Sequence, residues 1–152
     1  MLEWLVATDR HIQFIEQPMP RDASDKDLAW VKGRSPLPVF ADESCHTVKD
    51  VARCAELFHG VNVKLVKTGG VSMAYETLQA ARRAGLQTMI GCMIETSVLI
   101  SAAAHLAELA DYLDVDGNLL ITNDPFEGVT AQNGILSFRS AREKCGLRVT
   151  PR

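Results

Sequence analysis

The sequence predicts an α/β fold, in which parallel strands form a sheet and helices connect each strand to the next. Short apolar stretches alternate with amphipathic stretches at roughly 25 to 30 residues per unit, which is typical of strand–helix–strand repeats. Several short stretches are apolar almost throughout, as strands buried on both faces are. Charged residues follow the ends of these stretches. A (β/α)8 barrel and an open doubly wound sheet both place their sites there, so the periodicity leaves the two architectures open.

The first half of the chain supplies three predicted strands. Its elements are expected, in order, as a helix over 1–8, a strand over 12–16, a helix over 25–31, a strand over 38–41, a helix over 47–58 and a strand over 61–66. Ser24 is the predicted N-cap of the second helix, because a serine side chain accepts a hydrogen bond from the free backbone N–H groups there. Gln17-Pro18 ends the first strand, since proline cannot donate to a sheet.

The second half continues the alternation. Its elements are expected as a helix over 71–84, a strand over 87–93, a helix over 98–110, a strand over 112–115, an extended piece over 119–121 and a hairpin arm over 133–138. Gly85 stands where helices commonly end in a left-handed residue, so it is the predicted stop of the first of these helices. Thr96 or Ser97 is expected to cap the next helix, which is rich in alanine.

Composition excludes several classes of protein. The 152 residues are 47% hydrophobic and 23% charged, which suits one packed domain or one part of a larger one. The formal net charge is -3 and the pI about 5.8, so no basic patch favours nucleic acid or an anionic membrane as a partner. No apolar run is long enough to span a bilayer, and residues 1–9 do not resemble a signal peptide. Four cysteines without C-x-x-C spacing indicate reduced thiols, and hence a cytoplasmic protein.

Two acidic residues end neighbouring predicted strands. Glu16 closes the first strand and Asp42 follows the second, so parallel pairing would bring both carboxylates to one edge of the sheet. Mg2+ takes oxygen ligands and usually keeps waters or substrate oxygens, and two carboxylates are a minimum for holding it. The alternative is a set of salt bridges at the strand ends, with Lys64 paired to Glu16 or Asp42. Residue types and spacing leave both interpretations open.

Lys64 lies in an apolar stretch that ends in the pair Gly69-Gly70, which suits a tight turn or the close approach of a ligand. A lysine in such a stretch is either held by acidic neighbours or desolvated until its pKa falls. Beside a bound cation, a lysine of lowered pKa can take a proton from the carbon next to a substrate carboxylate. Magnesium would stabilise the charge that develops on the carboxylate oxygens.

Three ordered motifs resemble one known family. They are Phe14-Ile15-Glu16-Gln17-Pro18, then Ala41-Asp42-Glu43-Ser44, then Val63-Lys64-Leu65-Val66-Lys67-Thr68-Gly69-Gly70. Together they resemble the C-terminal barrel of the enolase superfamily, in its muconate-lactonising branch, and the resemblance extends over residues 12–149. It implies an α/β fold equal to strands 4–8 of a (β/α)8 TIM-type barrel. It also implies Mg2+ as cofactor, Glu16 and Asp42 as its ligands, and Lys64 as the acid/base residue.

Two further stretches resemble the dipeptide epimerases of that branch, Gly91-Cys92-Met93-Ile94-Glu95-Thr96-Ser97 and Asp114-Val115-Asp116. Alternate residues of a strand face the same way, so Asp114 and Asp116 can present two carboxylates together. By resemblance this pair binds the free amino group of a dipeptide substrate, typically L-Ala-D/L-Glu, and Met93 lines the pocket. The alternatives are a solvated turn for the two aspartates, since Gly117-Asn118 follows them, and a core position for Met93.

Three other charged residues are assigned supporting positions. Glu43 is expected to contact a metal ligand rather than the metal, or to be a surface acid beside a helix. Glu95 is expected to orient a ligand or to cap the helix that follows it. Lys67 has the opposite pleat parity to Lys64, so it is expected to face the helices or a loop.

The resemblance also implies what residues 1–152 would lack. They correspond to a partial barrel domain, without the family's capping domain and first barrel strands, which carry a second lysine and a further metal-ligand aspartate. An epimerase needs a base on each face of the carbon, and five strands cannot close an eight-stranded barrel. The chain alone is therefore expected to be inactive, with the missing N-terminal half or a second copy as its partner. The alternatives are a muconate cycloisomerase, an o-succinylbenzoate synthase-like enzyme, and a non-catalytic truncated product.

Overall fold

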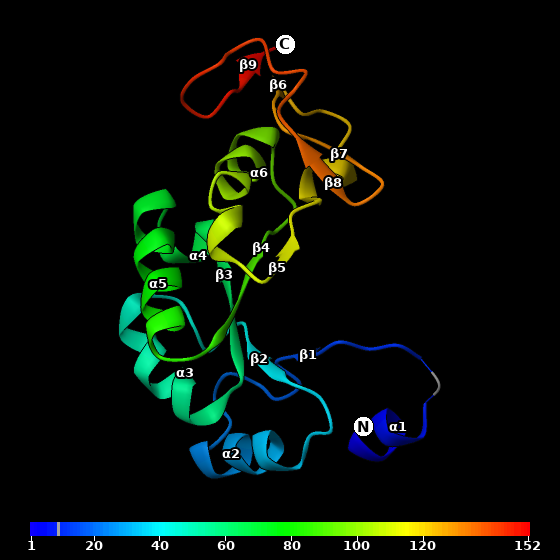
Figure 1. The fold of residues 1–152 in the computed structure, drawn as a ribbon, viewed down its shortest axis with the longest axis vertical. Coiled ribbons are helices and arrows are strands. Elements are labelled where there is room, and N and C mark those ends of the chain that lie inside the picture. Colours follow the sequence, from blue (N-terminus) through cyan, green and yellow to red (C-terminus); the bar gives the residue numbers. More distant parts are fainter. Residues whose placement is uncertain (9) are drawn as a thin grey trace.

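A five-stranded parallel sheet organises the molecule (Figure 1). The structure is a computed structural model that describes residues 1–8 and 10–152. The strands are β1 (Ile15–Glu16), β2 (Val39–Ala41), β3 (Gly60–Lys64), β4 (Gln87–Gly91) and β5 (Tyr112–Asp114). They lie in sequence order, and every neighbouring pair is parallel. A doubly wound sheet would reverse its strand order, so the sheet is half of a barrel, and the α/β prediction is confirmed.

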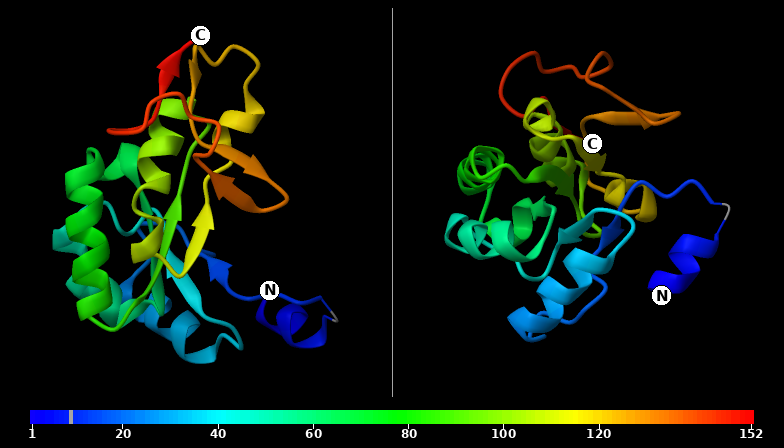
Figure 2. Two further views of the ribbon diagram at one scale, coloured as in Figure 1. Left: turned by 45° about the horizontal axis from the view of Figure 1, so that its top comes forward. Right: turned by 60° about the horizontal axis from the view of Figure 1, so that its bottom comes forward.

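Helices cover one side of this sheet (Figure 2). They are α2 (Asp25–Arg34), α3 (Val51–Leu57), α5 (Val71–Arg83) and α6 (Ser97–Ala104). Leu78 of α5 and Leu57 of α3 are buried in one core with Val61, Val63 and Ile90 of the strands. Strands with one face under helices must be apolar on that face, which explains the apolar stretches of the sequence. Within the described ranges, no helix has the length and hydrophobicity needed to cross a membrane.

The other face of the sheet carries three aromatic rings below the strand ends. Phe14 lies 4.6 Å from Phe40 and 4.7 Å from Tyr112, between ring centroids, so residues next to β1 and on β5 meet across this face. Gly60, the register partner of Phe40, leaves room for the rings. A Cβ at that position would lie 2.5 Å from the Phe40 ring. The three rings therefore lie on the same face of the sheet as the charged residues at the strand ends, and below them.

The predicted element bounds differ from the structure where a strand meets a turn. The first strand begins at Ile15 rather than at residue 12, and the fourth ends at Gly91 rather than at residue 93. The third strand was predicted to reach residue 66, but it ends at Lys64, and α4 (Leu65–Thr68) follows as one helical turn. The N–H groups of Gly69 and Gly70 both donate to the carbonyl of Leu65, at 3.0 and 2.9 Å, and Gly69 has φ 95°. The glycine pair therefore closes a helical turn.

Two further predicted elements, in the second half of the chain, differ from the structure. The long helix expected over 98–110 is wrong in its second half: α6 ends at Ala104, His105 stacks on Phe138 at 4.6 Å, and the 3-10 turn η2 (Ala107–Leu109) follows. The extended piece expected over 119–121 is also wrong, because η3 (Gly117–Leu120) is a 3-10 turn. Alanine-rich composition favours a helix, but this one stops at Ala104, and the next residue stacks on Phe138.

Most of the remaining elements follow the predictions, except the strand pair of residues 126–127 and 150–151, which was not predicted. α1 (Leu2–Ala7) is the expected first helix, and the helix expected over 47–58 consists of the 3-10 turn η1 (Val48–Asp50) followed by α3. Ser24 caps α2 by accepting from the N–H of Asp27. In the C-terminal segment, β7 (Thr130–Gln132) and β8 (Ile135–Ser137) form a hairpin, and β6 (Phe126–Glu127) pairs with β9 (Thr150–Pro151).

Candidate active site

The parallel register brings the charged residues to one edge of the sheet. Lys64 is the register partner of Gly91, and Gly91 is the partner of Asp114. Glu16 ends β1, and Asp42 follows β2 directly. Because all five strands run the same way, these positions lie at the carboxyl ends of the strands. Lys64 and Asp114 share one register row through Gly91, whereas Glu16 pairs with Phe40, two residues before Asp42. Four of the predicted site residues therefore lie at the same edge of the sheet.

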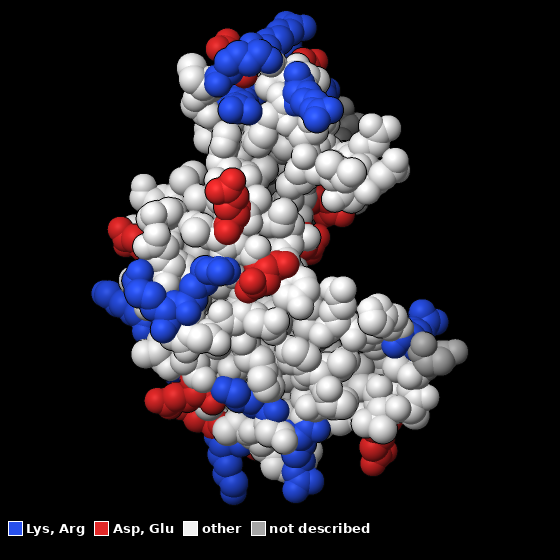
Figure 3. Space-filling model, viewed as in Figure 1, with Lys and Arg blue, Asp and Glu red and all other residues white. Residues whose placement is uncertain are grey.

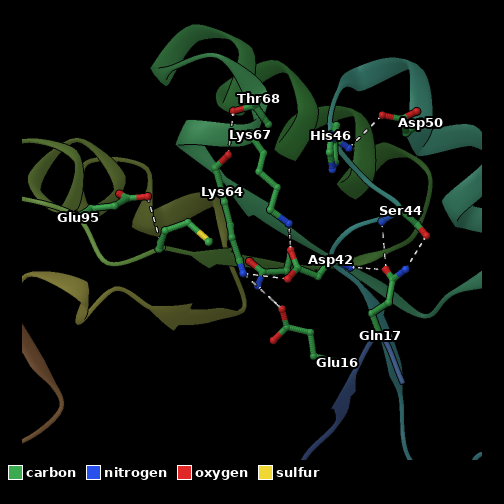
Figure 4. A network of polar contacts seen from close by, with 12 residues as sticks. Glu16, Gln17, Asp42, Ser44, His46, Asp50, Lys64, Lys67, Thr68 and Glu95 are labelled. Carbon is green, nitrogen blue, oxygen red and sulfur yellow. Dashed lines mark hydrogen bonds and ion pairs between the residues drawn. The ribbon is translucent and has the colours of Figure 1, made fainter. Parts of the chain in front are cut away.

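Asp42 is the centre of a compact charge cluster (Figure 4). Lys64 Nζ lies 2.8 Å from Asp42 Oδ2 and 3.9 Å from Glu16 Oε1. Lys67 Nζ donates to the other carboxylate oxygen of Asp42. Asp42 is only 6% exposed, so both of its oxygens are held by lysines in a partly buried setting. The strand-end salt bridges considered from the sequence are thus present.

The cluster sets the ionisation of its members. Burial by itself would raise the pKa of Asp42, but the hydrogen bonds from Lys64 and Lys67 outweigh it, and the pKa lies below its usual value. Burial would lower the pKa of Lys64, but the hydrogen bond and charge of Asp42 reverse that effect, and the pKa is raised. Of the two sequence-based alternatives for Lys64, the structure therefore has the lysine held by acidic neighbours rather than neutralised by burial.

Glu16 is oriented by a residue that the sequence analysis did not single out. Asn62 Nδ2 donates to Glu16 Oε1 at 2.7 Å, and Asn62 is 1% exposed. A Cβ on Gly91 would lie 2.5 Å from Asn62 Oδ1, so the glycine makes the space that the amide occupies. Burial raises the pKa of Glu16, the Asn62 bond opposes this, and the nearby Asp42 adds to the rise. The available signal was pleat parity, since Asn62 and Lys64 are two apart on β3.

Lys67 lies in a different place from the one predicted. A strand over 61–66 would turn its side chain away from Lys64, yet its ammonium group contacts the carboxylate of Asp42. The reason is that the strand ends at Lys64 and the helical turn α4 follows, so the alternation of strand side chains does not extend to Lys67. Lys64 and Lys67 therefore approach one carboxylate together.

The donor set is chemically suited to a hard cation. Glu16 and Asp42 offer carboxylate oxygens at neighbouring strand ends, and Mg2+ commonly uses one or two carboxylates, with waters and substrate oxygens completing its shell. Among the residues that the structure describes, no group of three or more His, Cys, Asp or Glu side chains gathers in a way that could hold a metal. Glu16 and Asp42 are thus the residues that would hold Mg2+, with further ligands from elsewhere.

Asp114 and Asp116 are exposed, and Val115 between them is 5% exposed. Asp114 is the last residue of β5 and is in register with Lys64 through Gly91. Asp116 lies just beyond the strand, at the residue before η3. Acidic side chains line the hollow on the right of the molecule, below the C-terminal hairpin, in Figure 3.

A depression of about 420 Å3 lies beside Lys64. Asp42, Glu43, His46, Lys64, Val66, Lys67 and Met93 line it. Met93 is 52% exposed, so it belongs to this depression and not to the core. Glu43 is exposed at its rim. The depression gives a ligand direct access to the ammonium group of Lys64.

Glu95 stabilises the turn after β4. Its Oε1 accepts from the N–H of Met93 at 3.0 Å, and the residue is 9% exposed. Glu95 thereby places Met93 at the edge of the depression.

The predicted side-chain caps of α6 are wrong. Neither Thr96 nor Ser97 caps this helix by its side chain. Asp124 takes that role instead, by accepting from the N–H and the hydroxyl of Ser97, at 2.8 and 2.6 Å.

Comparison with known proteins shows which proteins this chain is similar to. Residues 1–133 match the family model described as enolase C-terminal domain-like. An L-Ala-D/L-amino acid epimerase of Pedosphaera parvula is 73% identical over 98% of this chain and 43% of that protein. An L-Ala-D/L-Glu epimerase of Bacteroides thetaiotaomicron is 48% identical over 91% of this chain and 35% of that protein. The chain thus spans about two fifths of the length of these curated relatives.

A solved structure extends the likeness to the whole described fold. A dipeptide epimerase of Cytophaga hutchinsonii, in complex with Mg and the dipeptide D-Ala-L-Val, superposes with a TM-score of 0.86 at 28% identity. The match covers 99% of this chain and 41% of that one. The half-barrel is therefore the form that this part of the sequence takes in larger enzymes.

Proposed function

This chain belongs to the enolase C-terminal domain-like family, and on that premise we propose that it is the C-terminal part of a Mg2+-dependent dipeptide epimerase of the L-Ala-D/L-Glu type. The observation that carries the proposal is the contact of Lys64 with two carboxylates at neighbouring strand ends, 2.8 Å from Asp42 and 3.9 Å from Glu16. A base beside a metal-binding pair is what proton abstraction next to a carboxylate requires.

Lys64 is the proposed acid/base residue. Its pKa is raised in part by the hydrogen bond that Asp42 accepts, and engagement of the Asp42 carboxylate elsewhere would remove that contribution. The neutral amine then takes the proton from the α-carbon of the C-terminal residue of the dipeptide, and a donor on the opposite face completes the inversion. In the reverse direction the ammonium form of Lys64 donates the proton on its own face. A bound Mg2+, held by Glu16 and Asp42, would supply the positive charge that stabilises the carboxylate oxygens as the proton leaves.

Asp114 and Asp116 are the proposed site for the free amino group of the substrate. Both are exposed, and Asp114 is in register with Lys64 through Gly91, so an ammonium group bound there would hold the peptide across the strand ends. Charge-assisted hydrogen bonds from an ammonium group to carboxylates are among the stronger contacts available. Met93, at the edge of the depression, is proposed to contact the substrate, and Glu43 and Glu95 to support the loops around it.

Completion of the site is part of the proposal. Inversion at carbon needs a proton donor on the face opposite Lys64, and the described residues bring one lysine to the strand ends and a second, Lys67, onto Asp42. The curated relatives are more than twice as long as the part of them that this chain matches. We therefore propose residues 1–152 as a partial barrel domain that acts with an N-terminal segment like that of the relatives.

Complementation tests this function. The segment of the Pedosphaera parvula epimerase that precedes the matched region would be fused to this chain, and L-Ala-L-Glu would be followed by proton NMR in D2O with Mg2+ present. We expect exchange of the glutamate α-proton and formation of the second diastereomer, and both should be kept in Lys49→Ala, which alters an exposed lysine. Lys64→Ala should abolish formation of the second diastereomer, whereas exchange of an α-proton that faces the opposite base need not be lost. A fusion that ignored L-Ala-L-Glu but converted muconate or the o-succinylbenzoate precursor would show that the substrate assignment is wrong.

A further inference from the structure

Gln17 has a backbone conformation that its sequence position disfavours. Its φ is 24°, a positive value that residues other than glycine rarely adopt. Proline follows at position 18, and the residue before a proline is normally driven to extended conformations. A strained residue of this kind persists only where its surroundings hold it, and such residues gather at functional sites.

The side chain of Gln17 shows what holds it. Its Oε1 accepts from the backbone N–H groups of Asp42, at 2.8 Å, and of Ser44, at 3.1 Å. Its Nε2 donates to the hydroxyl of Ser44 at 2.7 Å. The backbone N–H of Gln17 also donates to the carbonyl of Phe40, at 2.8 Å. One side chain therefore spans from the end of β1 to the loop after β2 through three hydrogen bonds (Figure 4), and the backbone N–H adds a fourth bond, to β2 itself.

These bonds connect the two segments that carry the carboxylates of Glu16 and Asp42. Gln17 follows Glu16 in the chain, and its acceptor oxygen receives the N–H of Asp42 itself. Ser44 is 7% exposed, and its carbonyl accepts from the buried thiol of Cys54, so the far end of the bridge is anchored in the core. A shorter amide would not span the gap, and a glutamate would lack the donor to the Ser44 hydroxyl.

We infer that Gln17 is a positioning residue that sets the separation of the Glu16 and Asp42 carboxylates. The strained φ turns its side chain across the strand ends, and the bonds to Asp42 and Ser44 fix the loop after β2 against β1. The role of this separation in metal binding rests on the proposed function. The hydrogen-bonded bridge does not depend on that function. Partners that orient metal ligands are commonly important for metal affinity, which is the role assigned to Gln17.

Substitutions of Gln17 test whether its side-chain hydrogen bonds hold the loop after β2 in place. Gln17→Gly relieves the positive φ and removes the side-chain bonds, whereas Gln17→Glu keeps two acceptor oxygens on the same backbone. Amide hydrogen exchange by NMR on the 152-residue chain would compare both with Gln13→Gly, which alters an exposed glutamine in the same segment. In Gln17→Gly we expect the Asp42 and Ser44 amides to lose protection about tenfold or more while core amides of β3 keep theirs. Gln17→Glu and Gln13→Gly should keep most of the protection.

Two results would overturn the inference. Unchanged exchange at Asp42 and Ser44 in Gln17→Gly would mean that the bridge does not hold the loop. Equal loss of protection throughout the core would mean that Gln17 acts on overall stability.

The complemented enzyme supplies a second measurement. There, Gln17→Gly should raise the Mg2+ concentration for half-maximal activity about 10- to 100-fold and leave the KM for the dipeptide at saturating Mg2+ nearly unchanged. An unchanged Mg2+ requirement would reject the positioning role. Failure of the wild-type fusion to turn over would instead count against the proposed function, and the exchange experiment would still decide the inference.

Discussion

Removal of one carboxylate should destabilise this fold at neutral pH. Asp42→Asn leaves the Lys64 and Lys67 ammonium groups partly buried without the charge that compensates them, with side chains only 13% and 17% exposed. Breaking a buried ion pair from one side costs about 3–5 kcal/mol. The lower end applies here, because Glu16 remains 3.9 Å from Lys64 and the new amide keeps an acceptor oxygen. A loss of about 3 kcal/mol corresponds to a Tm lower by about 6–12 °C for a domain of this size.

The pH dependence of this loss identifies its cause. The lowered pKa of Asp42 contributes stability that is complete above the usual value of 3.8 and disappears as the pH falls through the folded-state pKa. The raised pKa of Lys64 contributes stability that is complete below the usual value of 10.5 and disappears as the pH rises through its folded-state pKa. The difference between wild type and Asp42→Asn should therefore be largest near neutral pH and shrink toward both extremes.

Urea unfolding followed by circular dichroism at acid, neutral and alkaline pH measures this difference. Asp22→Asn is the matched control, since it makes the same chemical change at an exposed position and should alter stability by less than about 0.5 kcal/mol. If Asp42→Asn were as stable as wild type at neutral pH, the lysines would not depend on Asp42, and the account of the charge cluster would be refuted.

Three further predictions concern other parts of the site. Gly91→Ala should destabilise the chain by about 1–3 kcal/mol in urea, because the new methyl would lie 2.5 Å from the buried amide of Asn62; an unchanged midpoint would show that Asn62 can move away. Asp124→Asn should cost about 1–3 kcal/mol, since the N–H and hydroxyl of Ser97 lose a charged acceptor. That loss should vanish in acid, where the lowered pKa of Asp124 is passed, so a difference that persisted there would reject the electrostatic cause. In the complemented enzyme, Asp116→Ala should weaken dipeptide binding by about 1.5–3 kcal/mol, seen as a higher KM; a fall in kcat alone would exclude an ammonium-binding role.

Local patterns in the sequence were sufficient for most of the elements. Strands that are apolar throughout, the N-cap at Ser24 and the left-handed glycine at residue 85 are properties of short segments, so they can be identified without knowledge of distant contacts. Positions where a segment ends against another one were harder. At the end of α6, His105 stacks on Phe138, which is 33 residues farther along the chain, and no local pattern contains that contact.

The same division applies to the charge cluster. Glu16, Asp42 and Lys64 were identifiable because each follows an apolar strand, and strand ends are where parallel sheets place charged groups. Lys67, Asn62 and Gln17 were not, although each contacts one of those residues or its backbone. Their roles depend on a helical turn after Lys64, a gap left by Gly91 and a strained φ, and these arise only when separate segments are packed together.

The sequence alone determined a parallel α/β fold with acidic and basic groups at the strand ends, because residue periodicity and strand-end chemistry are local. Periodicity left a barrel and a doubly wound sheet open; the family resemblance favoured the barrel, and the strand order of the tertiary structure confirmed it, since strand order depends on which backbones pair. Only the tertiary structure decided that Lys64 is a cation held by Asp42, because its pKa is the balance of burial against a contact between residues 22 positions apart.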